Sequence, residues 1–322
     1  MISADLQAAF QRLKGHIEHT PLTFDEKKQL YLKWENRQVT GSFKVRGALN
    51  KILSLKAEER MRTLVAASAG NHGQAVALAA RKVRGRATVF MPATAVPSKV
   101  AGTQALGATV KLVPGGYAAA EKAGLEFARK EAGVWISPYN DEQVIAGQGT
   151  LGLEILADLA GQRTGVWVVP AGGGGLASGV GLALENLPQR PKLIAVQAES
   201  SPFLHALYHR GTQEGVLDKP TLADGLAGAL EDDSLTAELV RRYADDVVLV
   251  SEEEIAQAMA FAWFRYGERI EGSAAAALAA LLYRGIRERP VVVIITGGNV
   301  EPSVHTRVCD EYRHLYAQGA SV

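Results

Sequence analysis

The sequence predicts a doubly wound α/β fold with mainly parallel sheets. Short runs of β-branched residues recur along the chain, and helical patterns rich in Ala, Leu, Glu and Lys lie between most of them. The runs are continuously apolar rather than alternating. Strands of a parallel sheet are covered on both faces, so they read as unbroken apolar runs separated by crossover helices.

The elements follow one another in a regular order. The predicted strands cover residues 63–66, 87–90, 109–112, 166–169, 193–196, 247–250 and 291–295. The predicted helices cover residues 74–82, 100–106, 118–131 and 151–159, and residues 1–16 have an amphipathic helical pattern. In such folds ligands bind at the carboxyl ends of the strands, so the loops that follow strands are expected to carry the site.

Composition excludes several classes of partner. The chain has 322 residues, enough for about two domains, and a net charge of +1, which gives no basic footprint for nucleic acid. Its longest apolar runs, residues 274–282 and 291–295, fall short of the ~18 residues of a membrane helix. A single cysteine, Cys309, forms no internal disulfide. We therefore expect a cytoplasmic protein whose partners are neither nucleic acid nor a membrane.

Lys44 is the first candidate for chemistry. It lies in a turn of small residues, Thr40-Gly-Ser-Phe-Lys44, placed to present an amine to a ligand. An amine becomes a useful nucleophile when burial or a cationic neighbour lowers its pKa, and we expect Arg46 to contribute the second effect.

Three further loops carry candidate binding groups. Ser68-Ala-Gly-Asn-His72 follows the strand at 63–66, where free amides at a helix start form an anion site. Pro170-Ala-Gly-Gly-Gly-Gly-Leu176 follows the strand at 166–169, and its four glycines let the backbone approach a phosphate closely. Thr296-Gly-Gly-Asn299 ends the last strand.

The segment Lys33-x-Glu35-x-x-Gln38-x-Thr40-Gly-Ser-Phe-Lys44-x-Arg46-Gly-Ala48 resembles the Schiff-base segment of the pyridoxal-phosphate-dependent serine/threonine dehydratase family, which has fold type II and is similar to the tryptophan synthase β chain. The resemblance covers nearly the whole chain. It implies pyridoxal 5'-phosphate as cofactor and a homodimer. It also implies two doubly wound domains, a large one of residues 1–62 and 138–322 and a small inserted one of residues 63–137.

The resemblance also implies roles for the site residues. Lys44 is the catalytic lysine and carries the cofactor. The other implied cofactor contacts are Phe43, Asn71, Gly172, Gly173, Gly174, Gly175, Leu176 and Thr296, and the implied substrate-binding residues are Ser68, Ala69, Gly70, Asn71 and His72. We assign His72 no general-base role. The hydroxyl of Thr296 would face the ring nitrogen, which makes the ring a weaker electron sink and favours elimination over transamination.

The expected activity is elimination of water from L-threonine, L-serine or both, giving a 2-oxo acid and ammonia. Serine racemases of this family carry a second serine directly before the Gly-Asn pair, where this chain has Ala69, so racemisation is expected to be weak. A dehydratase, racemase or β-replacement enzyme for another β-substituted amino acid remains an alternative, as does a bulkier β-hydroxy substrate. The segment Glu271-Gly-Ser-Ala, where the family has Glu-Pro-x-Gly, is expected to alter the substrate pocket.

Other classes of protein fit less of the chain. Gly172-x-Gly174-x-x-Ala177 fits a nicotinamide-binding fingerprint with Glu199 as the ribose-binding acid, but this reading leaves Lys44 without a function. A catalytically silent homologue would not need all four motifs. We predict no metal site. Glu199 matches the first cation ligand of some family members, but His205 stands where the second acid is expected, and a hard cation prefers oxygen ligands.

Overall fold

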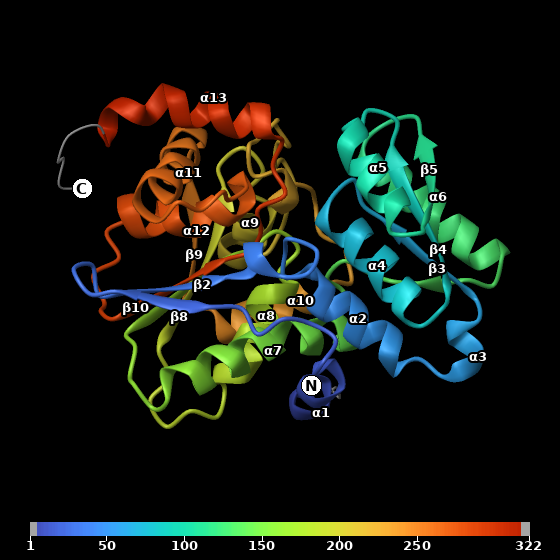
Figure 1. The fold of residues 1–322 in the computed structure, drawn as a ribbon, viewed down its shortest axis with the longest axis horizontal. Helices are drawn as coiled ribbons and strands as arrows, with labels where there is room; N and C mark the ends of the chain where they lie inside the picture. Colours follow the sequence, from blue (N-terminus) through green and yellow to red (C-terminus); the bar gives the residue numbers. More distant parts are fainter. Residues whose placement is uncertain (1–4, 317–322) are drawn as a thin grey trace.

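Two sheets organise the computed structural model, which describes residues 5–316 (Figure 1). The larger sheet has the strand order β1-β2-β10-β7-β8-β9, and the smaller has the order β5-β4-β3-β6. Only β1 runs antiparallel, to β2, and all other pairs are parallel. The predicted α/β fold with mainly parallel sheets is confirmed.

The bounds of the elements are as follows. The strands are β1 Leu22–Asp25, β2 Leu30–Trp34, β3 Thr63–Ala67, β4 Arg86–Pro92, β5 Thr109–Val113, β6 Val134–Trp135, β7 Val166–Pro170, β8 Lys192–Ala198, β9 Asp246–Val250 and β10 Val291–Ile295. The helices are α1 Leu6–Leu13, α2 Lys44–Ser54, α3 Ala57–Arg60, α4 Asn71–Lys82, α5 Pro97–Ala105, α6 Tyr117–Lys130, α7 Glu142–Leu159, α8 Gly175–Leu184, α9 Phe203–Arg210, α10 Leu235–Tyr243, α11 Glu252–Tyr266, α12 Gly272–Tyr283 and α13 Pro302–Tyr312, and η2 (Asp224–Leu226) is a short 3-10 turn.

All seven predicted strands are present, and six of them are longer than predicted by one to three residues. The prediction missed β1, β2 and β6. It also placed the start of α4 at residue 74 and the start of α7 at residue 151, whereas these helices begin at Asn71 and Glu142. Residues 1–4 of the predicted N-terminal helix lie outside the described part.

Helices cover both faces of each sheet. One face of the larger sheet packs against α11 and α12, and the other packs against α7 and α8 (Figure 1). The smaller sheet packs against α4 on one face and α6 on the other. Each sheet and the helices packed on it form one group of elements, the larger group around the larger sheet and the smaller group around the smaller sheet. Helix α2 packs against α7 of the larger group and α4 of the smaller group, so it connects the two. Lys44, its first residue, therefore lies between the two sheets.

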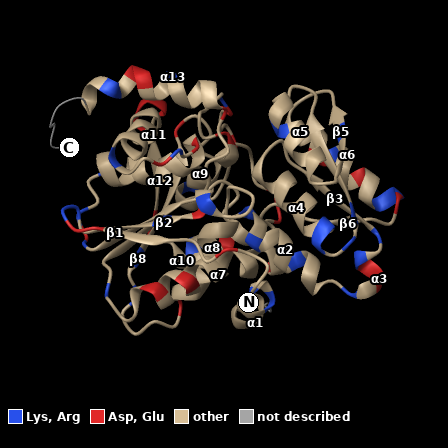
Figure 2. Cartoon of the chain, in the orientation of Figure 1, with Lys and Arg blue, Asp and Glu red and all other residues tan. Residues whose placement is uncertain are grey.

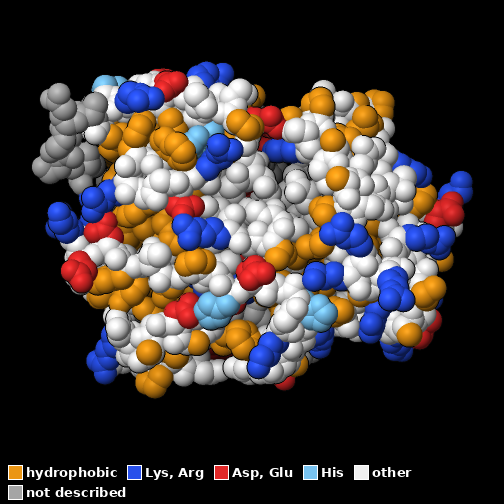
Figure 3. All heavy atoms as spheres, viewed as in Figure 1, with side chains coloured by type: hydrophobic (Ala, Val, Ile, Leu, Met, Phe, Trp, Pro, Cys, Tyr) orange, Lys and Arg blue, Asp and Glu red, His pale blue; other side chains and the backbone are white. Residues whose placement is uncertain are grey.

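The surface carries both signs of charge. Lysine, arginine and acidic residues are interspersed along the chain and over the face in view (Figures 2 and 3). Within residues 5–316, no helix combines the length and the apolar character that crossing a membrane requires.

Candidate active site

One cavity of about 320 Å³ is lined by all four predicted loops. This volume is within the range of small-molecule sites. The lining includes every predicted catalytic, cofactor-binding and substrate-binding residue: Phe43, Lys44, Ser68, Ala69, Gly70, Asn71, His72, Gly172, Gly173, Gly174, Gly175, Leu176 and Thr296. The structure thus brings together residues that are up to 253 positions apart in the chain (296 − 43).

The loop before Lys44 is fastened to the end of strand β10. The amide of Phe43 donates to the Thr296 carbonyl at 3.0 Å, and the amide of Gly298 donates to the Gly41 carbonyl at 3.0 Å. Gly41 has a φ of +69°, and a Cβ there would lie 2.5 Å from the Asn299 side chain. Only glycine fits this turn, and the turn places Lys44 at the first position of α2.

The Lys44 amine is enclosed within the cavity. Its Nζ donates to the Pro138 carbonyl at 2.9 Å. Burial lowers the pKa of Lys44 to about 8, and the negative charge of Glu271 opposes that shift. A lysine with this pKa has an appreciable neutral fraction near physiological pH, as a nucleophile or a general base requires.

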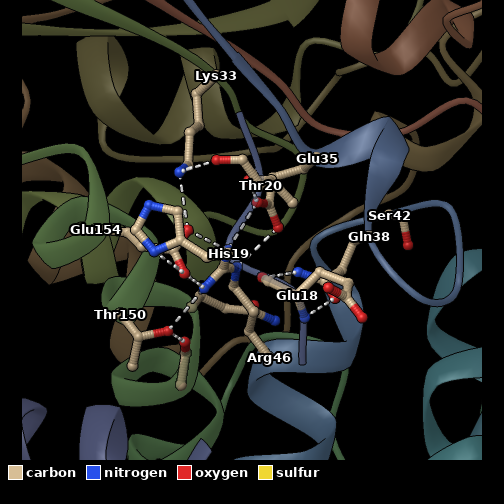
Figure 4. Close-up of polar contacts among 12 residues, drawn as sticks. Glu18, His19, Thr20, Lys33, Glu35, Gln38, Ser42, Arg46, Thr150 and Glu154 are labelled. Carbon is tan, nitrogen blue, oxygen red and sulfur yellow. Dashed lines mark hydrogen bonds and ion pairs between the residues drawn. The ribbon is translucent and has the colours of Figure 1, made fainter. Parts of the chain in front are cut away.

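The expectation that Arg46 lowers the pKa of Lys44 is wrong. Arg46 is completely buried, and its guanidinium donates to Glu35 at 2.7 Å and to Glu154 at 2.7 Å (Figure 4). Lys33 joins the same cluster at 2.8 Å from Glu154. Because two carboxylates neutralise its charge, Arg46 is a structural cation.

The loop at residues 68–72 forms the start of α4. The Ser68 hydroxyl accepts a hydrogen bond from the Gly70 amide at 3.1 Å, and the helix begins at the next residue, Asn71. The first amides of a helix have no partner within the helix, and the helix dipole favours an anion there. The loop therefore suits a carboxylate.

His72 is held as a structural residue. It is buried, and its Nε2 donates to the Ile136 carbonyl at 2.9 Å. Burial and the charge of Lys44 lower the pKa of His72 to about 3, so the ring is neutral in the physiological range. This environment agrees with our decision to assign it no general-base role.

Asn71 is held by two side chains from the larger group of elements. Its Nδ2 donates to Glu271 Oε1 at 2.7 Å, and its Oδ1 accepts from Asn299 Nδ2 at 2.7 Å. Burial, with the charge of Asp224, raises the pKa of Glu271 to about 7. The sequence connects the segment at Glu271 with the substrate pocket but assigns Glu271 itself no role, because a carboxylate just before an apolar helix also fits an ordinary helix start.

The four glycines form a closely packed turn into α8. A Cβ on Gly172 would lie 2.9 Å from Leu226, and one on Gly173 would lie 2.5 Å from the Tyr139 ring. Gly174 has a φ of +81°, which favours glycine. The turn presents backbone amides rather than side chains to the cavity, at the positive end of a helix.

These features fit pyridoxal phosphate. An amine of lowered pKa, a glycine turn that admits no Cβ and a nearly buried hydroxyl at Thr296 line the same cavity. The amine suits the aldehyde of the cofactor, the glycine turn suits its phosphate, and the Thr296 hydroxyl suits its ring nitrogen.

Glu199 lies outside this cavity. One of its carboxylate oxygens is 3.2 Å from Arg284, which also contacts Glu254. In the part of the chain that the structure covers, no group of three or more His, Cys, Asp or Glu side chains gathers to hold a metal ion. Glu199 therefore gains no support as a cation ligand.

Comparison with known proteins gives matches over most of the chain. Residues 13–297 match the family described as pyridoxal-phosphate dependent enzyme. The chain is 44% identical to the L-threonine ammonia-lyase of Thermotoga maritima, over 95% of this chain and 78% of that protein. It is 40% identical to the catabolic L-threonine dehydratase TdcB of Escherichia coli K12, over 93% of both. The crystal structure of the threonine deaminase of T.th. superposes with a TM-score of 0.84 and 34% identity, over 92% of this chain and 97% of that one.

Proposed function

The chain belongs to the pyridoxal-phosphate dependent enzyme family, and we propose that it is a lyase that eliminates water from L-threonine or L-serine. The products are a 2-oxo acid and ammonia. The observation that carries the proposal is the Lys44 amine, whose pKa is about 8, in one cavity with an anion-binding helix start and a glycine turn. Similarity to L-threonine ammonia-lyases and dehydratases supports threonine as a substrate.

Different residues of the cavity bind different parts of the cofactor. The glycine turn, Gly172 to Gly175 with Leu176, would hold the cofactor phosphate through backbone amides, and the Thr296 hydroxyl would serve the ring nitrogen. Asn71 and Phe43, which line the same cavity, would hold the ring. Pyridoxal phosphate, when bound, withdraws electrons from the substrate and makes the proton on Cα acidic.

Lys44 and the 68–72 loop act on the substrate. The loop from Ser68 to His72 binds the substrate carboxylate through backbone amides at the start of α4. Lys44 would hold the cofactor through its side-chain amine and, when that amine is free, would accept the Cα proton as general base. Its pKa of about 8 suits both steps, because the neutral amine is accessible at the working pH.

The two groups of elements have separate roles in this proposal. Residues 63–137 form an inserted substrate-binding domain, and residues 1–62 and 138–322 form the cofactor-binding domain. The packing of α2 against both α4 and α7 supports a shared site at their junction. The family relation supports a homodimer, and the single cysteine Cys309 suits a cytoplasmic protein.

A panel of β-hydroxy amino acids tests the activity. The cofactor-loaded protein is incubated with L-threonine, L-serine and bulkier analogues, and 2-oxo acid and ammonia are measured. We expect equimolar release from threonine, serine or both. A loaded protein that releases neither product from any of them would point to β-replacement or to a silent homologue.

A further inference from the structure

Glu271 lies where the loops of the cavity meet. Its amide donates to the Gly297 carbonyl at 3.1 Å, and its carbonyl accepts from the Ala275 amide at 3.0 Å, inside α12. A Cβ on Gly297 would lie 2.6 Å from Glu271 Oε1. The side chain is 7% exposed and lines the cavity beside Lys44. Glu271 is therefore fixed by its backbone and enclosed by its neighbours.

The carboxylate determines how Asn71 is oriented. Asn71 Nδ2 donates to Glu271 Oε1, and Asn71 Oδ1 accepts from Asn299 Nδ2, each at 2.7 Å. Asn299 Nδ2 also donates to the Thr40 carbonyl at 2.8 Å. If the Asn71 amide were flipped, its Oδ1 would lie against the Glu271 carboxylate and its Nδ2 against the Asn299 amino group. Neither pair could then form a hydrogen bond. Glu271 and Asn299 together thus permit one orientation.

The carboxylate is also a negative charge close to Lys44. The charged or titratable groups that act on Glu271 or Lys44 are Asp224 from η2, Lys99 from α5 and His72 from α4. Tyr117 of α6, Tyr139 and Asp218 line the same cavity. Asp224 and Lys99 form an ion pair at 2.7 Å, and His72 is neutral. In the described chain Glu271 is in no ion pair, and the charges of Lys99 and Asp224 act on its carboxylate in opposite directions.

We propose that Glu271 is a positioning residue, which fixes the amide of Asn71 and supplies the negative charge that favours the protonated Lys44 nitrogen. The inference deepens the proposed lyase function and rests on it for its catalytic meaning. Burial alone would favour the neutral amine more strongly, and the Glu271 charge opposes this effect. Burial and the Glu271 charge together set the pH at which Lys44 gains and loses its proton.

Two substitutions separate the two roles. Glu271→Gln removes the charge but keeps an oxygen that can accept from Asn71. Glu271→Asp keeps the charge but is one methylene shorter, so it does not reach Asn71. Glu268→Gln is the matched control, because Glu268 is also nearly buried, contacts Asn36 and lies outside the cavity.

The main readout is the pH at which the visible absorption of the bound cofactor changes. The pH profile of kcat/KM is the second readout. For Glu271→Gln we expect both midpoints to move down by about one pH unit, because loss of a nearby anion disfavours the protonated amine. For Glu271→Asp we expect an unchanged midpoint and cofactor binding weakened several-fold, and Glu268→Gln should follow the wild type.

A Glu271→Gln midpoint equal to that of the wild type, or an equal shift in Glu268→Gln, would overturn the charge role. If Glu271→Gln does not fold, Glu271→Asp still decides the orientation role, since wild-type cofactor affinity would contradict it. The absorption titration requires bound cofactor but no turnover. Absence of 2-oxo acid release would thus contradict the lyase proposal and leave the Glu271 result standing.

Discussion

Single residues in the cavity owe their properties to their surroundings. The sequence motifs identified Lys44, Asn71 and the glycine turn, because each lies in a loop that follows a strand or an apolar stretch. The sequence connects the segment at Glu271 with the substrate pocket but gives Glu271 itself no role. Its contact with Asn71 joins positions 200 residues apart, and no local pattern records such a contact. The expected effect of Arg46 also failed, because its charge is neutralised by Glu35, 11 residues away, together with Glu154, 108 residues away.

Ala69 provides a prediction at this scale. It lines the cavity directly before Gly70 and Asn71, and its methyl group has no proton to give. We expect Ala69→Ser to raise the formation of D-serine from L-serine, because a hydroxyl there can protonate Cα from the face opposite to Lys44. Chiral chromatography of reaction mixtures measures the product. Wild-type levels of D-serine in a folded, cofactor-loaded variant would contradict this role.

Among the elements, α7 begins nine residues before its predicted start, because its first half is stabilised by packing rather than by local preference. Its first half contains Gly147 and Gly149, which disfavour a helix in isolation, so the prediction began at residue 151. In the structure a Cβ on Gly147 would lie 2.6 Å from the Arg46 carbonyl, and one on Gly149 would lie 2.6 Å from the Gly179 carbonyl. The glycines let α7 touch α2 and α8 closely. Tertiary packing thus overrides the local preference.

The contact between α2 and α7 contains the buried charges of Figure 4. Burial alone would raise the pKa of Glu154, but Arg46 and Lys33 outweigh it and hold the pKa below its ordinary value. Strand β2 supplies Lys33 and η1 (Glu35–Arg37) supplies Glu35. The cluster therefore fastens the start of α2, and with it Lys44, to the larger sheet.

Removal of Arg46 leaves the buried Glu35 carboxylate without a cationic partner and leaves Glu154 to Lys33. We expect Arg46→Met to lower the free energy of unfolding by about 3 to 5 kcal/mol, as is typical when one member of a buried ion pair is removed. Denaturant titration measures it. The control is Arg37→Met, whose arginine is 52% exposed and pairs with Glu268, and whose loss should cost about 1 kcal/mol or less. Equal stabilities of the two variants would contradict the structural role of Arg46.

The whole molecule is two sheet layers joined around one cavity. Besides α2, side-chain contacts cross between them at the rim. Lys99 of α5 pairs with Asp224 of η2 at 2.7 Å, and Ser98 donates to Glu301. Both Lys99 and Asp224 line the cavity. The pair therefore joins the smaller group of elements to the larger one at the cavity.

Screening of the Lys99–Asp224 pair by salt should weaken substrate binding. Asp224 is 62% exposed, so the pair is worth about 1 kcal/mol or less, equivalent to about fivefold in KM. We expect the wild-type KM for threonine to rise with sodium chloride and that of Lys99→Gln to start higher and stay constant. Lys192→Gln, at an exposed pair with Glu288, should behave as wild type. A salt response in Lys99→Gln equal to that of the wild type would contradict the rim contact.

The account as a whole depends on a covalent link between Lys44 and the cofactor. Borohydride reduction of the loaded protein, followed by proteolysis and mass spectrometry, tests this link directly. We predict that the reduced cofactor is found on the peptide that contains Lys44, and that Lys44→Ala yields no modified peptide and no visible absorption band. A cofactor found on another lysine, or an unmodified Lys44 in a loaded protein, would contradict the account.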